Sequence, residues 1–232
     1  MRFTTPTEIE SVAWEGELLQ PSVSFDTKGS VSIVAALGRP EVWPAADALE
    51  GVVGKKWIPP LGGAGFWLLR LACTLHEPEG RRSLVSAEER LFLRPRSPAA
   101  EEGAAYAHSL FPERLGVEDK AELNASLGPE LKFGEAGLKV GEVGASIEYR
   151  KVFPVIQAYG AGEPSPWWEF KAHDAYPLAG SQFVYAVVAA LAGAGGIRAA
   201  VELVVTVESR WGGLVRLGLP EEAHAHLSFN IP

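Results

Sequence analysis

The sequence of 232 residues contains a single cysteine, Cys73, so no intramolecular disulfide can form. Cys73 lies in the apolar run of residues 71–75. A catalytic thiol needs a nearby cation or a helix N-terminus to lower its pKa, and the sequence shows neither here. We therefore predict that Cys73 is a small core residue and not a nucleophile.

Other thermolabile residues are also scarce. There are one methionine, two asparagines and three glutamines, against 17 prolines. This composition is typical of proteins from thermophiles, because Asn, Gln, Cys and Met are the residues that heat damages most. It predicts a thermostable protein, although a GC-rich genome produces part of the same bias.

Basic residues are fewer than acidic ones: the sequence has 21 Lys and Arg, 29 Asp and Glu, and a net charge of −8. This balance argues against nucleic acid or an anionic membrane as a partner.

No apolar run reaches the ~18 residues that a membrane-spanning helix needs. Residues 1–6 contain no apolar segment of a signal peptide, so we expect a cytoplasmic location. The glycine-rich segments 61–65 and 193–196 lack the Lys-Ser/Thr of a phosphate-binding loop, and we expect no cofactor.

The strongest positive signal is the segment 183–207, where two apolar arms flank a glycine-rich link at 192–196. In the second arm every second residue from Ile197 to Val207 is apolar, and Arg198, Glu202 and Thr206 lie on the opposite face, which predicts a strand with one buried face. The first arm is apolar on both faces, which predicts a strand in the middle of a sheet, covered on both sides. Because glycines accept the positive φ of short loops, we predict a β-hairpin.

Short turns follow this segment at residues 210–213 and 220–222. They predict two more strands, at 214–219 and 223–231, and hence a four-strand antiparallel meander. In the last strand His224 and His226 would share the polar face.

Earlier segments give weaker patterns. Residues 66–76 and 81–93 predict a pair of strands, and the turn at 26–29 predicts another hairpin. Residues 45–53 predict a short helix, and residues 8–14 allow either helix or strand. Residues 97–110 have helical propensity, yet we favour a strand at 104–111 because of the repeat described next.

The chain shows signs of an internal repeat. Pairs such as Pro60 with Pro177 and Phe66 with Phe183 recur at an offset near 120 residues, and further short strands are expected within 118–152. Coincidence is the alternative, because the matching residue types are common here. We predict an all-β protein with minor helix, built as two tandem antiparallel β-sandwich-like domains, 1–112 and 113–232, related by duplication.

Aromatic residues gather beside prolines, which suggests an aromatic platform for a peptide, a glycan or a protein surface. The alternative is that each large side chain plugs an open end of a sandwich. Because neighbouring residues on a strand point to opposite faces, at least one of Trp167 and Trp168 is expected to be exposed. The candidate binding residues are Trp167, Trp168, Phe170, Trp43 and Trp57.

Catalytic and metal-binding patterns are weak. His224 and His226 have a spacing found in metal sites, but a third ligand is missing apart from Glu222. Glu163, Glu169 and Asp174 surround the tryptophan pair, and paired carboxylates beside tryptophan suggest a glycosidase. His173 precedes Asp174, but adjacent side chains seldom form the hydrogen bond that orients a general base.

We therefore expect a non-enzymatic interaction or scaffold module that binds a protein partner through aromatic, proline-rich loops or through a sheet edge. One alternative is a carbohydrate-active or metal-dependent hydrolase that uses the acidic residues near the tryptophan pair. A second alternative is a structural component of a virion or tail. The sequence leaves the oligomeric state and the identity of the partner open.

Overall fold

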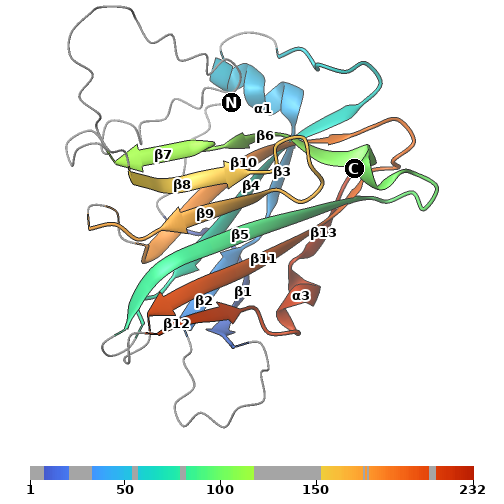
Figure 1. Ribbon diagram of the computed structural model, residues 1–232. Coiled ribbons are helices and arrows are strands. Elements are labelled where there is room, and N and C mark those ends of the chain that lie inside the picture. The colour runs from blue at the N-terminus through green and yellow to red at the C-terminus, as the bar shows by residue number, and fades with distance from the viewer. Residues whose placement is uncertain are drawn as a thin grey trace, which may run out of the picture.

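The computed structural model describes residues 8–20, 33–53, 57–78, 82–117, 153–174, 176, 178–208 and 213–232. Two antiparallel sheets pack face to face, and a short helix lies beside them (Figure 1). The predicted all-β class with minor helix is therefore confirmed. Within these ranges no helix has the length and apolar character needed to cross a bilayer.

Sheet A has the strand order β1-β2-β4-β10-β6, and β3 also pairs with β4. Its central strands, β4 and β10, run antiparallel over their whole lengths. The strands are β1 (Val12–Leu18), β2 (Ile33–Gly38), β3 (Glu41–Pro44), β4 (Gly65–Leu75), β6 (Ala105–Phe111) and β10 (Gly180–Ala190).

Sheet B has the order β12-β11-β5-β9-β8-β7, and β13 also pairs with β11. The remaining elements are the helices α1 (Ala45–Val53) and α3 (Ala223–His226) and the 3₁₀ turn η1 (Glu102–Ala104). The strands are β5 (Ser83–Pro95), β7 (Arg114–Val117), β8 (Phe153–Tyr159), β9 (Trp167–Lys171), β11 (Ile197–Glu208), β12 (Leu214–Gly218) and β13 (Ser228–Ile231).

Strand β10 is covered on both faces, as its apolar sequence predicts. One face, which includes Val184 and Ala186, lies in the main core between the two sheets. The other face, which includes Tyr185 and Val187, packs in a second core with Ala48 and Leu49 of α1. Because β10 pairs with β4 on one side and β6 on the other, it lies in the middle of sheet A.

The predicted hairpin between β10 and β11 is wrong. The two arms are strands as expected, but β10 belongs to sheet A and β11 to sheet B, so the segment is a β-arch that connects the sheets (Figure 1). The link from β4 to β5 also passes from sheet A to sheet B. Because the two sheets pack face to face, the inner face of sheet A covers the apolar face of β11. Edge-to-edge pairing of β11 with β10 alone would leave that face exposed.

The C-terminal meander is only partly confirmed. β12 forms the expected antiparallel pair with β11, but β13 also pairs with β11 instead of with β12. Residues 223–226 form the helix α3 and not a strand, and the Ala223 amide donates to the Pro220 carbonyl (3.0 Å) at its start. The proline and the alanines favour a helical turn here, which local alternation did not reveal.

Several predictions of single helices and strands are confirmed. The helix at 45–53 and the strand at 105–111 are confirmed, and residues 12–14 begin β1. The turn predicted at 26–29, residues 210–212 of the turn predicted at 210–213, and the strands predicted within 118–152 lie outside the described residues.

The two predicted halves are interleaved. Sheets A and B each contain strands from before and after residue 112, so they form one two-sheet sandwich in place of two tandem ones. The strands that the repeat equates are neighbours, because β4 pairs with β10 and β5 pairs with β11. The duplication itself stays a prediction.

Backbone hydrogen bonds protect two edges of the sandwich. Leu19, just after β1, exchanges two hydrogen bonds with Gly218 of β12 (2.9 and 2.8 Å), which ties the edge of sheet A to the edge of sheet B. At the opposite edge of sheet A, Ala107 of β6 bonds to Gly162 (2.7 Å) and Glu163 (3.0 Å) in the β8–β9 loop. Covered edges of this kind are less open to pairing with another chain.

The β-arch between β10 and β11 depends on Gly196, which has a φ of +97°. A Cβ at this position would lie 2.8 Å from the Ile231 carbonyl oxygen, which belongs to the backbone of β13. We expect Gly196→Ala to lower the free energy of unfolding by about 2 kcal/mol or more, because strain and the contact add. Urea denaturation would measure it.

Gly193→Ala is the matched control, because Gly193 also has a positive φ (+89°) but no atom lies within 4 Å of the place that an added methyl group would take. It should lose only the conformational term, roughly 1 kcal/mol. Equal losses in the two variants would contradict the contact with Ile231.

Candidate functional site

Trp167 and Trp168 point to opposite faces of sheet B. Trp168 is fully buried in the core between the sheets, and Phe170 is buried beside it, whereas Trp167 is 36% exposed on the outer face. The expectation that at least one tryptophan of the pair is exposed is therefore met. Of these three aromatic residues, Trp167 alone has the exposure that a contact surface needs.

Trp167 stacks on Tyr159 of the neighbouring strand β8, with ring centroids 4.9 Å apart and planes 16° apart. The two residues are cross-strand partners, which fixes the stack. Beside it lies a pocket of about 260 Å³ lined by Arg90, Phe92, Ser165 and Trp167. We call these five residues the Trp167 face.

Charged side chains order the strands around the Trp167 face. Glu88 accepts hydrogen bonds from Arg90 of its own strand and from Arg216 of β12 (3.2 Å). Glu169 pairs with Lys171 (3.2 Å) and accepts from the Tyr159 hydroxyl (3.3 Å). Each of these partly exposed pairs adds little stability, but together they hold Arg90 and Tyr159 in place beside Trp167.

The proline-rich loop before β9 is firmly attached to β5. The Leu91 amide donates to the Pro166 carbonyl (2.9 Å), and the Leu93 amide donates to the Pro164 carbonyl (2.8 Å). The loop therefore continues the ladder between β5 and β9, and proline fixes φ within it. Trp167 thus extends from a backbone that is ordered in advance of any binding.

Trp43 and Trp57 lie elsewhere, in the second core on the outer side of sheet A. The Arg70 guanidinium lies 5.5 Å from the Trp43 ring centroid and pairs with Glu41 of β3. Trp57 packs edge-on against Phe66 with centroids 5.4 Å apart. The five candidate binding residues therefore do not form one platform, since the two sheets separate these tryptophans from Trp167.

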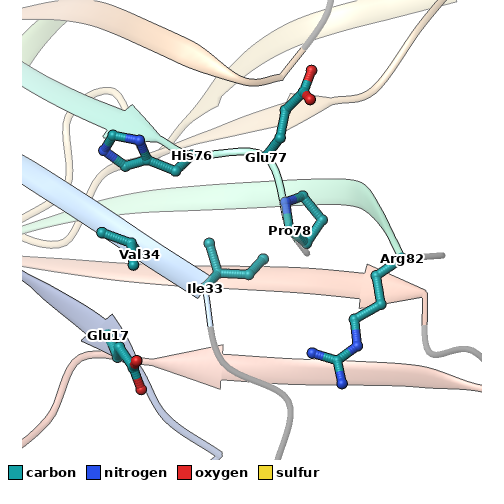
Figure 2. A pocket seen from close by; sticks show the side chains of 7 residues that line it. All are labelled: Glu17, Ile33, Val34, His76, Glu77, Pro78 and Arg82. Atoms are coloured by element: carbon teal, nitrogen blue, oxygen red, sulfur yellow. The ribbon is translucent and has the colours of Figure 1, made fainter. Parts of the chain in front are cut away.

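A second pocket, of about 360 Å³, opens where β1, β2 and the β4–β5 link meet, and Figure 2 shows its lining. The Glu77 carboxylate points away from the other side chains (Figure 2). The lining mixes both signs of charge, so it does not favour an anionic or a cationic ligand. Its residues are Glu17, Ile33, Val34, His76, Glu77, Pro78 and Arg82.

The catalytic and metal candidates do not converge. His224 and His226 are exposed and lie on the short helix α3, so the predicted strand face that would carry both is wrong. Glu169 is held by Lys171 and Tyr159, and Glu163 lies at the edge of β6. Within the part of the chain that the structure describes, no three His, Cys, Asp or Glu side chains are grouped to hold a metal ion.

The main core contains a polar cluster that faces inward from both sheets. Glu89 of β5 is fully buried, and its cross-strand partners are Trp168 on β9 and Leu203 on β11. Cys73 of β4 faces Glu89 from sheet A, and its own cross-strand partner is Gln182 of β10. Gln182 accepts a hydrogen bond from the Tyr176 hydroxyl (2.9 Å).

Burial raises the pKa of Glu89 to about 8, so its carboxyl is mainly protonated at neutral pH. The Cys73 thiol lowers the pKa of Glu89 by less than burial raises it, and neither oxygen of Glu89 has a hydrogen-bond partner of normal geometry among the described residues. Burial, and then the nearby Glu89, raise the pKa of the Cys73 thiol. Cys73 is thus an inert core thiol, as its sequence context predicts.

Sequence reasoning missed Glu89, although the signal was present. From Ala87 to Leu93 the strand alternates, and Glu89 takes an inward position between Ala87 and Leu91. A glutamate on the apolar face of a strand is rarely buried without a partner, which marks the position as unusual. The neighbouring Glu88 and Arg90 hid this pattern within a run of charges.

Comparisons with known proteins identify no family. No family model matches the chain, and no curated protein matches it. Among solved structures, the chain is similar to the Clostridium perfringens NetB toxin in its membrane-inserted form, at 7% sequence identity and a TM-score of 0.32, over 94% of this chain and 100% of that one. A TM-score this low carries no argument about function.

Proposed function

We propose that the protein is a non-enzymatic interaction module that binds a protein partner through the Trp167 face. The observation that supports this most is a partly exposed tryptophan stacked on Tyr159 beside a pocket. Tryptophan, tyrosine and arginine are the residues most enriched where binding energy concentrates in protein interfaces. Trp167, Tyr159 and Arg90 supply all three within one small area.

Preorganisation adds to this argument. The stack, the ion pairs of Glu88 and Glu169 and the ladder through Pro164 and Pro166 order these groups before a partner arrives. Less conformational entropy is then lost on binding, which favours affinity. The 260 Å³ pocket would accept one apolar side chain of the partner.

Trp167→Ala is expected to weaken binding of a protein partner by roughly thirtyfold or more, which corresponds to about 2 kcal/mol for a central aromatic contact. Partners would be identified by affinity purification with the wild-type protein and then measured directly by calorimetry with purified components.

Ile58→Ala is the control, because Ile58 is 78% exposed and precedes β4 on the sheet A side. It should leave the affinity unchanged. A partner that binds wild type and Trp167→Ala equally would refute the Trp167 face as the contact surface. Binding to a glycan array that disappears in Trp167→Ala would replace the protein partner with a carbohydrate.

A further inference from the structure

The centre of the sandwich contains a buried acid that the proposed function does not use. Glu89 lies on β5, next to the middle of sheet B, and no part of it reaches solvent. Both of its carboxyl oxygens and the Trp168 Nε1 lack hydrogen-bond partners within the described ranges. An ionised carboxylate in such surroundings is strongly unfavourable, so the position tolerates only the neutral acid well.

We propose that Glu89 makes the sandwich pH-sensitive: the two sheets hold together most firmly in acid, and they open more readily as the pH rises, because the Glu89 carboxyl loses its proton when the sheets separate. Opening here means separation of β5 from β4 that admits water to Glu89 and exposes Cys73. This device is independent of the Trp167 face, which lies on the other side of sheet B.

The groups around Glu89 do not compensate its charge. From sheet A it faces Cys73, and Tyr176 with Gln182 lie next to that thiol. From its own sheet, β9 and β11 present the uncharged Trp168 and Leu203. No Lys, Arg or His of the described residues contributes to the pKa of Glu89, and burial also raises the pKa values of Cys73 and Tyr176. Among these neighbours there is therefore no cation to stabilise the ionised form.

The direction in which stability changes with pH follows from proton linkage. The pKa of Glu89 is about 8 in the folded chain, against 4.5 for the unpaired side chain. Between these values the folded state binds the proton that the unfolded state has lost. The stabilising contribution of the neutral acid is therefore complete below about pH 4.5, falls as the pH rises to about 8, and does not fall further above it.

Cys73 provides a specific reporter, because it is the only cysteine in the sequence and is fully buried next to Glu89. Its reaction with a small disulfide reagent such as dithiodipyridine reports how often the core opens, provided that closing is faster than the reaction. The exposed thiol reacts equally fast in wild type and in a variant at any one pH. The ratio of the two rates therefore isolates the opening equilibrium.

The test compares wild type with Glu89→Gln, whose neutral amide has nearly the same shape as the protonated acid. We expect the rate ratio of wild type to Glu89→Gln to rise by up to tenfold per pH unit between about pH 5 and about pH 8, and then to level off. The rate ratio of wild type to Glu169→Gln, which removes a partly buried acid from the outer face of the same sheet, should stay constant over this pH range. A ratio that stays constant with pH would overturn the proposal.

Urea unfolding of the same proteins gives a second measurement. The difference in midpoint between Glu89→Gln and wild type should grow over the same pH range, in favour of the variant. If Glu89→Gln does not fold, the wild type alone decides: its thiol reactivity, corrected for the pH dependence of a model thiol, must still increase towards pH 8. A corrected rate that is flat with pH would refute the proposal.

Discussion

Trp168→Ala is expected to lower the free energy of unfolding by about 3–5 kcal/mol, the loss typical of a large aromatic side chain removed from a core. Trp168 is among the largest side chains that are fully buried, and it lies between Glu89 and Ala158 on the inner face of sheet B. The space that it leaves cannot be filled by its neighbours, because their backbones are fixed in the ladder.

The adjacent residue gives a matched control within the same strand. Trp167→Ala removes the same number of atoms from the outer face, where the ring is already 36% exposed, and should cost about 1 kcal/mol. Chemical denaturation of both variants would measure the difference. Similar losses would contradict the assignment of inner and outer faces to these neighbours.

Trp168→Phe refines the result. Phenylalanine keeps much of the apolar volume and removes the indole N–H, which has no hydrogen-bond partner in the described structure. Since an unpaired buried donor is itself destabilising, the loss should be well below that of Trp168→Ala. A phenylalanine variant as unstable as the alanine one would indicate that the N–H is bonded.

Glu89→Leu is expected to raise the free energy of unfolding by about 2–4 kcal/mol at pH 7, an unusual gain for one substitution. The folded chain must keep Glu89 protonated at this pH, about 2.5 pH units above its ordinary pKa of 4.5, and each unit corresponds to ~1.4 kcal/mol. Leucine has a similar volume and needs no proton or hydrogen bond.

The pH dependence of this gain in unfolding free energy shows how much of it comes from removing the buried acid and how much from better packing. At about pH 3, well below the ordinary pKa of 4.5, the glutamate is neutral in both states, so the advantage of leucine should shrink to the packing difference alone. Glu169→Leu, on the outer face of the same sheet, should change stability by less than about 1 kcal/mol at either pH. Equal gains for Glu89→Leu at both pH values would contradict the raised pKa of Glu89.

The strands could be predicted from the sequence because alternation and burial follow from the same geometry. The segment 197–207 alternates, and its apolar residues, such as Val201 and Leu203, are buried. The apolar character of β10 on both faces likewise predicted its central place. These are local properties, which depend only on where each side chain points.

Strand pairing could not be predicted, because it depends on contacts between distant residues. The link predicted at 192–196 fits a hairpin and a β-arch equally well. Which of the two forms depends on what covers the apolar face of β11, and that is decided by strands far away in the sequence. The same limit applies to the candidate site. Alternation separated Trp167 from Trp168, but it could not show that Tyr159 and Arg90 lie beside Trp167, since β5, β8 and β9 are brought together only by the sheet.

The two β-arches described above have a consequence for how the chain reaches its native state. The long central ladder of sheet B joins β5 to β11, and that of sheet A joins β4 to β10, so partners such as Leu91 and Val201 are separated by more than a hundred residues. Contacts between distant residues require closure of large loops, and such topologies fold slowly.

During synthesis, β5 therefore leaves the ribosome well before its partners β9 and β11 exist, and β4, which can already pair with β2 and β3, leaves well before β10. The apolar faces of both strands and at least one backbone edge of each are then uncovered. Nascent chains in that condition are prone to aggregate and are typical substrates of chaperones. The yield of soluble protein should thus depend more on translation speed and chaperone supply than the compact final structure would suggest.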